Sequence, residues 1–222
     1  MRARIEQRLP FWEPLFVVLL AIVIDITLPD KLSPLHPQWL LPALEGALLV
    51  GLLTSSMSSP HPRVHHSMLR RRLAIALTAV VSAVNLVSLG LLVHFLLQPV
   101  HRTPISGHSL ILAGSALWIT NVLLFGLWYW EIDRGGPVSR RLTEDRAPDF
   151  LFPQMTDPKW APTDWAPQLV DYLYVSLTNA TAFSPTDTMP LTATAKWLMG
   201  SQAVSSLVTV GLVVARAVNI LS

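Results

Sequence analysis

Five long apolar runs, separated by shorter polar segments, dominate the hydrophobic pattern of this chain. They cover approximately residues 11–28, 37–57, 73–97, 109–130 and 191–221. A helix needs roughly 20 apolar residues to cross the hydrocarbon core of a bilayer. The runs therefore predict an all-α, polytopic membrane protein with five transmembrane helices.

The pattern changes just before the fifth run, in the stretch DYLYVSLTNATAFSPTDTMP over Asp171–Pro190. This stretch predicts a pore helix over 168–180, a filter-like loop over 181–189 and an inner helix over 190–221. A short helix followed by a return loop is typical of a re-entrant segment. Irregular backbone at membrane depth is tolerated only where protein buries it or water reaches it. The stretch therefore favours a water-filled pathway or a site buried in protein.

Seven residues of this stretch follow the spacing D-x-L-Y-x-S-x-x-T-x-T-T-x-G-Y-G-D-x-x-P. They are Asp171, Leu173, Tyr174, Ser176, Thr181, Asp187 and Pro190. Through these seven residues the chain resembles the pore region of the potassium-channel superfamily. The resemblance covers about the last 55 residues. The chain also resembles an uncharacterised bacterial family of membrane proteins that carries TNATAFSPTD. The resemblance implies a homo-tetramer that passes small inorganic ions along its axis, because one half-pore cannot enclose a channel.

The G-Y-G core of the channel pattern is absent. Ser184, Pro185 and Thr186 occupy it, with Phe183 before them. Proline fixes φ and lacks an N–H, so a row of dehydrated potassium sites is not expected. The filter-like loop instead offers hydroxyls and one carboxylate, which would favour cations: Thr181, Ser184, Thr186, Thr188 and Asp187. Alternatively, Asp187 caps the inner helix, which Pro190 would begin.

Polar residues recur along one face of the inner helix. The face comprises Gln202, Ser205, Thr209, Leu212 and Arg216, spaced by three or four residues. It could line a pathway, or it could pack against another helix through small residues. Arg216 could pair with Asp25 or extend to lipid head groups.

Two acidic residues fall inside apolar runs. Asp25 lies near the end of the first run, and Glu45 lies within the second. Ionisable residues at membrane depth are costly and are by default functional candidates. Glu45 would suit proton or ion coupling, or would pair with an arginine.

Two regions follow from these elements. Residues 1–106 are expected to form a three-helix peripheral region, and residues 107–222 a pore module. The pore module consists of an outer helix, a polar connector over 131–167, and the pore helix, loop and inner helix defined above. The connector is expected to form an irregular cap at the membrane surface.

The composition limits which kinds of site and partner the chain is expected to have. Apolar residues make up 51% of the chain, charged residues 14%, and the formal net charge is +2. So small a charge gives no reason to expect nucleic acid, and the absence of cysteine excludes disulfides and thiolate sites. No catalytic motif, metal-ligand set or cofactor fingerprint is present, so we expect no enzyme, no metal and no cofactor.

The basic residues predict the orientation. Three arginines precede the first run, four lie between the second and third, and four arginines with one lysine lie in the connector. Only Lys31, Arg102 and Arg216 are expected on the other side. The positive-inside rule then makes the N-terminus cytoplasmic, in a bacterial cytoplasmic membrane. The resemblance to potassium channels, whose pore loop enters from outside, would instead place the N-terminus outside. The expected function is non-selective conduction of small cations; the alternatives are a non-conducting scaffold that binds partners, and an ion-coupled transporter using Glu45.

Overall fold

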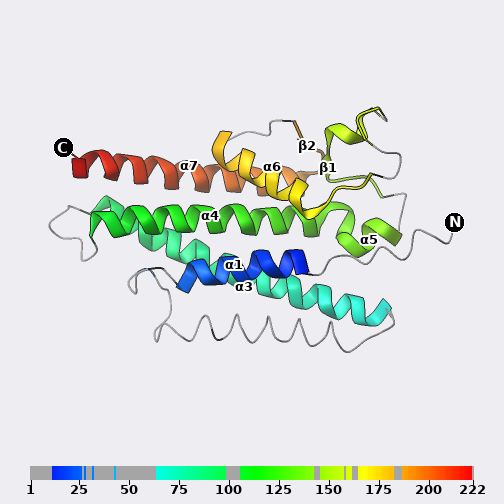
Figure 1. Cartoon of the computed structure of the whole chain (residues 1–222), viewed down its shortest axis with the longest axis horizontal. Helices are drawn as coiled ribbons and strands as arrows, with labels where there is room; N and C mark the ends of the chain where they lie inside the picture. The colour runs from blue at the N-terminus through cyan, green and yellow to red at the C-terminus, as the bar shows by residue number, and fades with distance from the viewer. Residues whose placement is uncertain are drawn as a thin grey trace.

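The computed structural model describes residues 12–26, 28, 32, 43, 64–98, 106–142, 146–157, 159–161, 165–182 and 187–221. In this part of the chain, long helices lie side by side with a small irregular region at one end (Figure 1). The helices are α1 (Trp12–Ile26), α3 (Val64–Leu97), α4 (Gly107–Ile132), α5 (Pro137–Leu142), α6 (Leu169–Ala182) and α7 (Ala193–Leu221). Two short strands, β1 (Phe150–Leu151) and β2 (Met189–Pro190), complete the described elements.

Three helices of the described residues are long and apolar enough to cross a membrane. Their apolar spans are Arg71–Leu97, Gly107–Gly135 and Ala193–Val218, which match the third, fourth and fifth runs of the sequence. α1 contributes a shorter apolar stretch over Pro14–Ile24. The run at 37–57, apart from residue 43, lies outside the described residues. The chain is therefore a mostly helical membrane protein, with three candidate spans in its described part.

α4 is the central helix, because α1, α3, α6 and α7 all pack against it. α3 runs antiparallel to it: Arg71 at the start of α3 contacts Glu131 near the end of α4, and Asn85 reaches the Leu117 carbonyl. α7 is also antiparallel to α4, since a Cβ on Gly114 would contact Val213 near the far end of α7.

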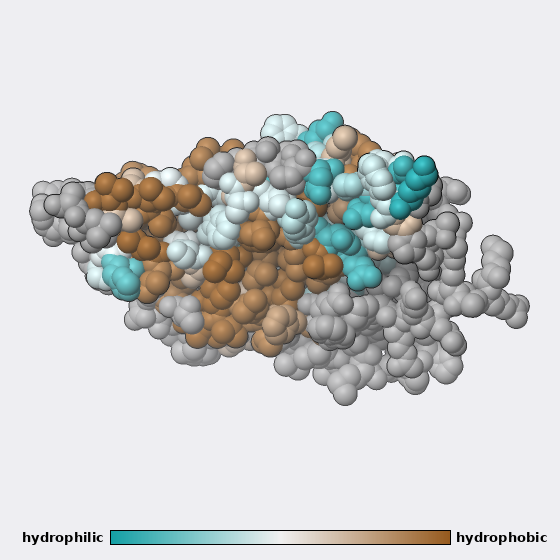
Figure 2. All heavy atoms as spheres, turned by 45° about the horizontal axis from the view of Figure 1, so that its top comes forward, coloured by the Kyte–Doolittle hydropathy of each residue, from teal (hydrophilic) through white to brown (hydrophobic). Residues whose placement is uncertain are grey.

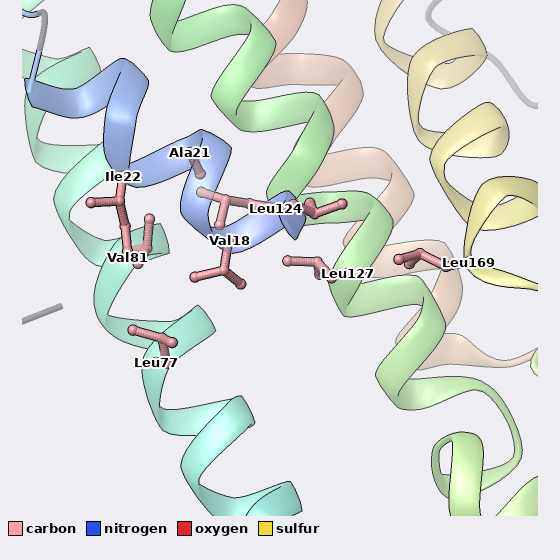
Figure 3. Packing of buried hydrophobic residues seen from close by; sticks show 9 residues of the cluster. Val18, Ala21, Ile22, Leu77, Val81, Leu124, Leu127 and Leu169 are labelled. Carbon is pink, nitrogen blue, oxygen red and sulfur yellow. The ribbon is translucent and has the colours of Figure 1, made fainter. Parts of the chain in front are cut away.

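Apolar side chains join α1 to this bundle. Figure 3 shows Val18, Ala21 and Ile22 of α1 between α3 and α4. They meet Leu77 and Val81 of α3 and Leu124 and Leu127 of α4, while Leu169 of α6 packs on the other side of α4.

Large apolar side chains also cover the outside of the bundle. Examples are Leu86 on α3, Leu112 on α4, and Val204 and Leu207 on α7. In water such exposure would be costly, but in a bilayer these faces meet acyl chains. Several polar residues of the same helices, among them Asn85, Asn121 and Gln202, are buried inside the bundle, as the next subsection describes.

Candidate functional site

α6 is a short helix whose two flanking strands pair with each other. β1 precedes it and β2 follows it, and the strands are antiparallel, with Phe150 opposite Pro190 and Leu151 opposite Met189. The 14 residues of α6 extend about 21 Å, which is less than the roughly 30 Å hydrocarbon core. The segment therefore leaves the β1–β2 end of the bundle and comes back to it, with α6 packed against α4 and α7 (Figure 1).

The start of α6 is capped by its own residues. The Asp171 carboxylate accepts the Gln168 backbone N–H at 2.7 Å, as a carboxylate in the first turn of a helix can. Burial raises the pKa of Asp171, and the hydrogen bond from Gln168 opposes that shift.

α6 approaches α4 closely at Gly126. A Cβ there would lie 3.2 Å from the Leu173 Cα atom and 2.6 Å from Leu173 Cδ2. Only a glycine leaves room for the backbone of α6 at this distance, so Gly126 sets the depth at which α6 lies against α4.

A network of neutral hydrogen bonds centred on Gln202 holds the second half of α6. Gln202 Nε2 donates to the Ser176 carbonyl at 3.0 Å and to Ser176 Oγ at 2.6 Å. Gln202 Oε1 accepts from the Tyr129 hydroxyl at 2.5 Å and from Asn179 Nδ2 at 2.9 Å. Ser176 Oγ donates onward to the Val122 carbonyl at 2.7 Å. We call Tyr129, Ser176, Asn179 and Gln202 the Gln202 network; it joins α4, α6 and α7.

All four hydrogen-bonding positions of the Gln202 amide are used, and its side chain is fully buried. A fully satisfied buried network fixes one arrangement of its helices, since any shift would leave polar groups unpaired. The Gln202 network therefore determines the register of α6 against α7.

A second, charged cluster lies at the start of α6 and centres on Asp133, directly after α4. Asp133 Oδ2 accepts the Tyr172 hydroxyl at 2.6 Å, and Oδ1 accepts the backbone N–H of Asp149 at 2.8 Å. The Arg140 guanidinium lies 3.8 Å from Asp133 Oδ2. Asp133 is fully buried, so these partners replace the water that an ionised carboxylate needs.

Asp149 extends this cluster to α7. Its carboxylate accepts the Arg134 backbone N–H at 2.9 Å and the Thr192 hydroxyl at 2.7 Å. Thr192 Oγ1 in turn accepts the Ala195 N–H at 3.3 Å and so caps α7. We call Asp133, Arg140, Asp149, Tyr172 and Thr192 the Asp133 cluster.

Arg140 fills the space between the aromatic rings of this cluster. Its guanidinium lies 5.8 Å from the Trp130 ring centroid and 5.2 Å from that of Tyr172, and it donates to the Trp130 carbonyl at 2.7 Å. Burial lowers the pKa of Arg140, and the Asp133 carboxylate opposes that shift. The cation is thus held by aromatic faces, carbonyls and one carboxylate.

The predicted filter-like loop is described only at its two ends. Thr181 lies exposed in the last turn of α6, where its hydroxyl donates to the Leu177 carbonyl at 2.9 Å. Asp187 is exposed, and Thr188 is buried. Phe183, Ser184, Pro185 and Thr186 lie outside the described residues.

The inner helix begins later than the sequence suggested. Met189 and Pro190 form β2, so Pro190 is not the first residue of α7, which starts at Ala193. Thr192 supplies the cap that had been considered for Asp187. Proline has no backbone N–H to donate to a neighbouring strand. It is tolerated at the end of a two-residue strand because no further strand hydrogen bond is needed there.

The polar face of α7 is turned toward the interior of the bundle. Gln202, Thr209 and Arg216 are buried, and Ser205 Oγ accepts Asn121 Nδ2 of α4 at 3.2 Å. Arg216 donates to the Gln98 carbonyl beside the end of α3 at 3.4 Å. Of the two interpretations of this face, the contacts within the chain are those of helix packing.

Of the two acidic residues in apolar runs, the structure places only the backbone of the first. Asp25 lies in the last turn of α1, and Glu45 lies outside the described residues. Among the residues that the structure describes, no three His, Asp or Glu side chains come together as a metal site would require.

Sequence reasoning missed the Asp133 cluster. The connector over 131–167 was expected to be an irregular cap, and it does contain α5, β1 and the Asp133 turn. Its DRGGP motif was the available signal, because two glycines and a proline after an aspartate mark a sharp change of backbone direction.

Comparisons with known proteins yield no relative: no family model, no curated protein and no solved structure matches this chain. The similarity to channel pore regions therefore depends on the seven residues of the stretch over Asp171–Pro190.

Proposed function

We propose that this protein is a pore-loop membrane protein that conducts small cations, without potassium selectivity, at the axis of a symmetric oligomer. The observation that carries this proposal is the excursion of α6, a helix too short to span whose flanking strands pair with each other. Such an excursion brings the chain back through irregular backbone, which in a membrane needs protein or water around it.

The direction of α6 supports a preference for cations. Its N-terminus lies at the Asp133 cluster, so its exposed C-terminus, with Thr181, lies farther along the bundle from that end. The last turn of a helix carries about half a negative charge on its free carbonyls. Thr181 and Asp187, both exposed, add oxygen atoms close to this end in sequence.

The pathway would lie between copies of the chain, because the polar face of α7 is occupied by contacts within one chain. The basic end of the bundle, with Arg71, Arg134 and Arg140, is also the end from which α6 starts. By the positive-inside rule this end faces the cytoplasm, so α6 would enter the membrane from that side.

A second candidate function is a non-conducting scaffold with the same architecture. The observation that favours it is the outward face of α7, which is apolar along its length through Trp197, Val204, Leu207, Val214 and Val218. Copies joined through this face alone would enclose a dry axis rather than a water-filled one.

Flux through liposomes separates the two functions, and the absence of cysteine allows a single reporter thiol. With Thr181→Cys, a charged methanethiosulfonate reagent is expected to block cation flux, because the reagent reacts only where water reaches the thiol. Ser115→Cys, exposed on the outer face of α4, is the matched control and is expected to leave flux unchanged. No flux of any ion across a range of pH and voltage would rule out conduction and favour the scaffold.

A further inference from the structure

The turn at Gly135 lies at the level of the membrane surface. One candidate span ends at Gly135, and another begins at Arg71, which pairs with Glu131 beside the turn. Figure 2 shows hydrophilic side chains gathered toward one end of the molecule, while the middle of the visible face is mostly hydrophobic. Side chains around Gly135 are therefore at the depth of lipid head groups.

Most charges around this turn neutralise one another. Arg71 lies 3.3 Å from Glu131, and Arg140 lies 3.8 Å from Asp133. The Asp149 carboxylate is used by the Arg134 backbone N–H and by the Thr192 hydroxyl.

Among the described residues, two guanidinium groups at the turn have no such carboxylate partner. Arg134 Nη2 donates to the sulfur of Met155 at 3.7 Å, and Arg134 Nε is buried without a hydrogen-bond partner in the same part of the chain. Arg146 is exposed, and its guanidinium lies against Gly135. Neither has a carboxylate within ion-pair distance among the residues that the structure describes.

The backbone brings these two groups to one place. Arg134, Gly135 and Gly136 all have positive φ, of 50°, 76° and 95°. A Cβ at Gly135 would collide with the Arg146 guanidinium and lie 3.2 Å from Ser139 Oγ. The turn thus gathers two arginines and one hydroxyl around Gly135, and Arg134 is its one non-glycine residue in the left-handed region.

We propose that Arg134 and Arg146 bind the phosphate group of an anionic phospholipid at the Gly135 turn. Guanidinium groups present paired N–H donors that match phosphate oxygens, and a basic group at head-group depth is attracted to anionic lipid. This inference depends on membrane insertion and not on conduction.

Lipid retention tests the proposal without any flux measurement. The purified protein in a neutral detergent is titrated with phosphatidylglycerol and with phosphatidylcholine, and bound lipid is counted by native mass spectrometry. We expect preferential binding of phosphatidylglycerol, weakened about tenfold by Arg134→Gln and by Arg146→Gln, as loss of one charged hydrogen bond would produce. Arg146 is exposed, so its variant tests the site even if Arg134→Gln fails to fold.

Arg72→Gln is the matched control, since Arg72 is an exposed arginine at the same end of the bundle. It is expected to bind phosphatidylglycerol as the natural chain does. Equal weakening by Arg72→Gln and Arg146→Gln would overturn the proposal in favour of general surface charge. If millimolar inorganic phosphate displaces the lipid, the site binds free phosphate, and the proposal that a phospholipid supplies the phosphate group is wrong.

Discussion

α6 is held at its two ends by different chemistry. At its start, the Asp133 cluster uses a buried carboxylate, a guanidinium and the Tyr172 hydroxyl. Toward its end, the Gln202 network uses only amides, hydroxyls and carbonyls. The charged cluster lies where a candidate span ends, and the neutral network lies about one helical turn deeper along α4 and nearly three turns deeper along α7. Charge is thus confined to the depth where water and head groups lower its cost, and neutral hydrogen bonds serve at greater depth.

The largest expected effect comes from breaking the charged cluster. Asp133→Ala would leave Arg140 buried without its carboxylate and would remove the acceptor of Tyr172. Removing one partner of a buried ion pair typically costs about 3–5 kcal/mol. The measurement is the free energy of unfolding in mixed micelles, followed by circular dichroism. Asp157→Ala, which removes only an acceptor for the Lys159 N–H in an exposed turn, is the control; equal losses in both variants would contradict a special role for Asp133.

A smaller effect is expected where α6 meets α4. Gly126→Val would push against the Leu173 backbone, and overpacking of this kind costs about 1–3 kcal/mol. Gly200→Val on α7 is the control, since nothing lies within 4 Å of a Cβ at that position. Unfolding in mixed micelles should separate the two variants, and identical stability would mean that α6 does not lie against Gly126.

The smallest of the three effects should come from the neutral network. Gln202→Leu would leave Ser176, Asn179 and Tyr129 short of partners, yet hydrogen bonds between helices in membranes contribute only about 1–2 kcal/mol. We expect a loss of that size in the same assay, and none for Ser201→Ala, the exposed neighbour. A loss as large as that of Asp133→Ala would contradict the distinction between the two regions.

The apolar runs at 73–97, 109–130 and 191–221 were predictable as helices, because 20 or more apolar residues in a row have few other solutions. The helix expected over 168–180 is found over Leu169–Ala182. The long helices and the short helix were predictable because each depends on a local pattern of residues, which can be read directly from the sequence.

The partners of the polar residues were not predictable in the same way. Spacing placed Gln202, Ser205, Thr209 and Arg216 on one face of a helix, but it could not say whether water or another helix meets that face. Asp133 and Tyr172 are 39 residues apart, and no local pattern indicates that they touch. The β1–β2 pair was missed because two residues are too few to form an alternating pattern.

The pairing of β1 with β2 has a consequence for synthesis of the chain. α6 leaves the ribosome before β2, Thr192 and Gln202, which are the residues that fasten it. A segment of 14 residues is also a poor stop signal for the insertion machinery. α6 should therefore remain unanchored until α7 has been made, and nascent chains arrested before residue 189 should leave it open to protease.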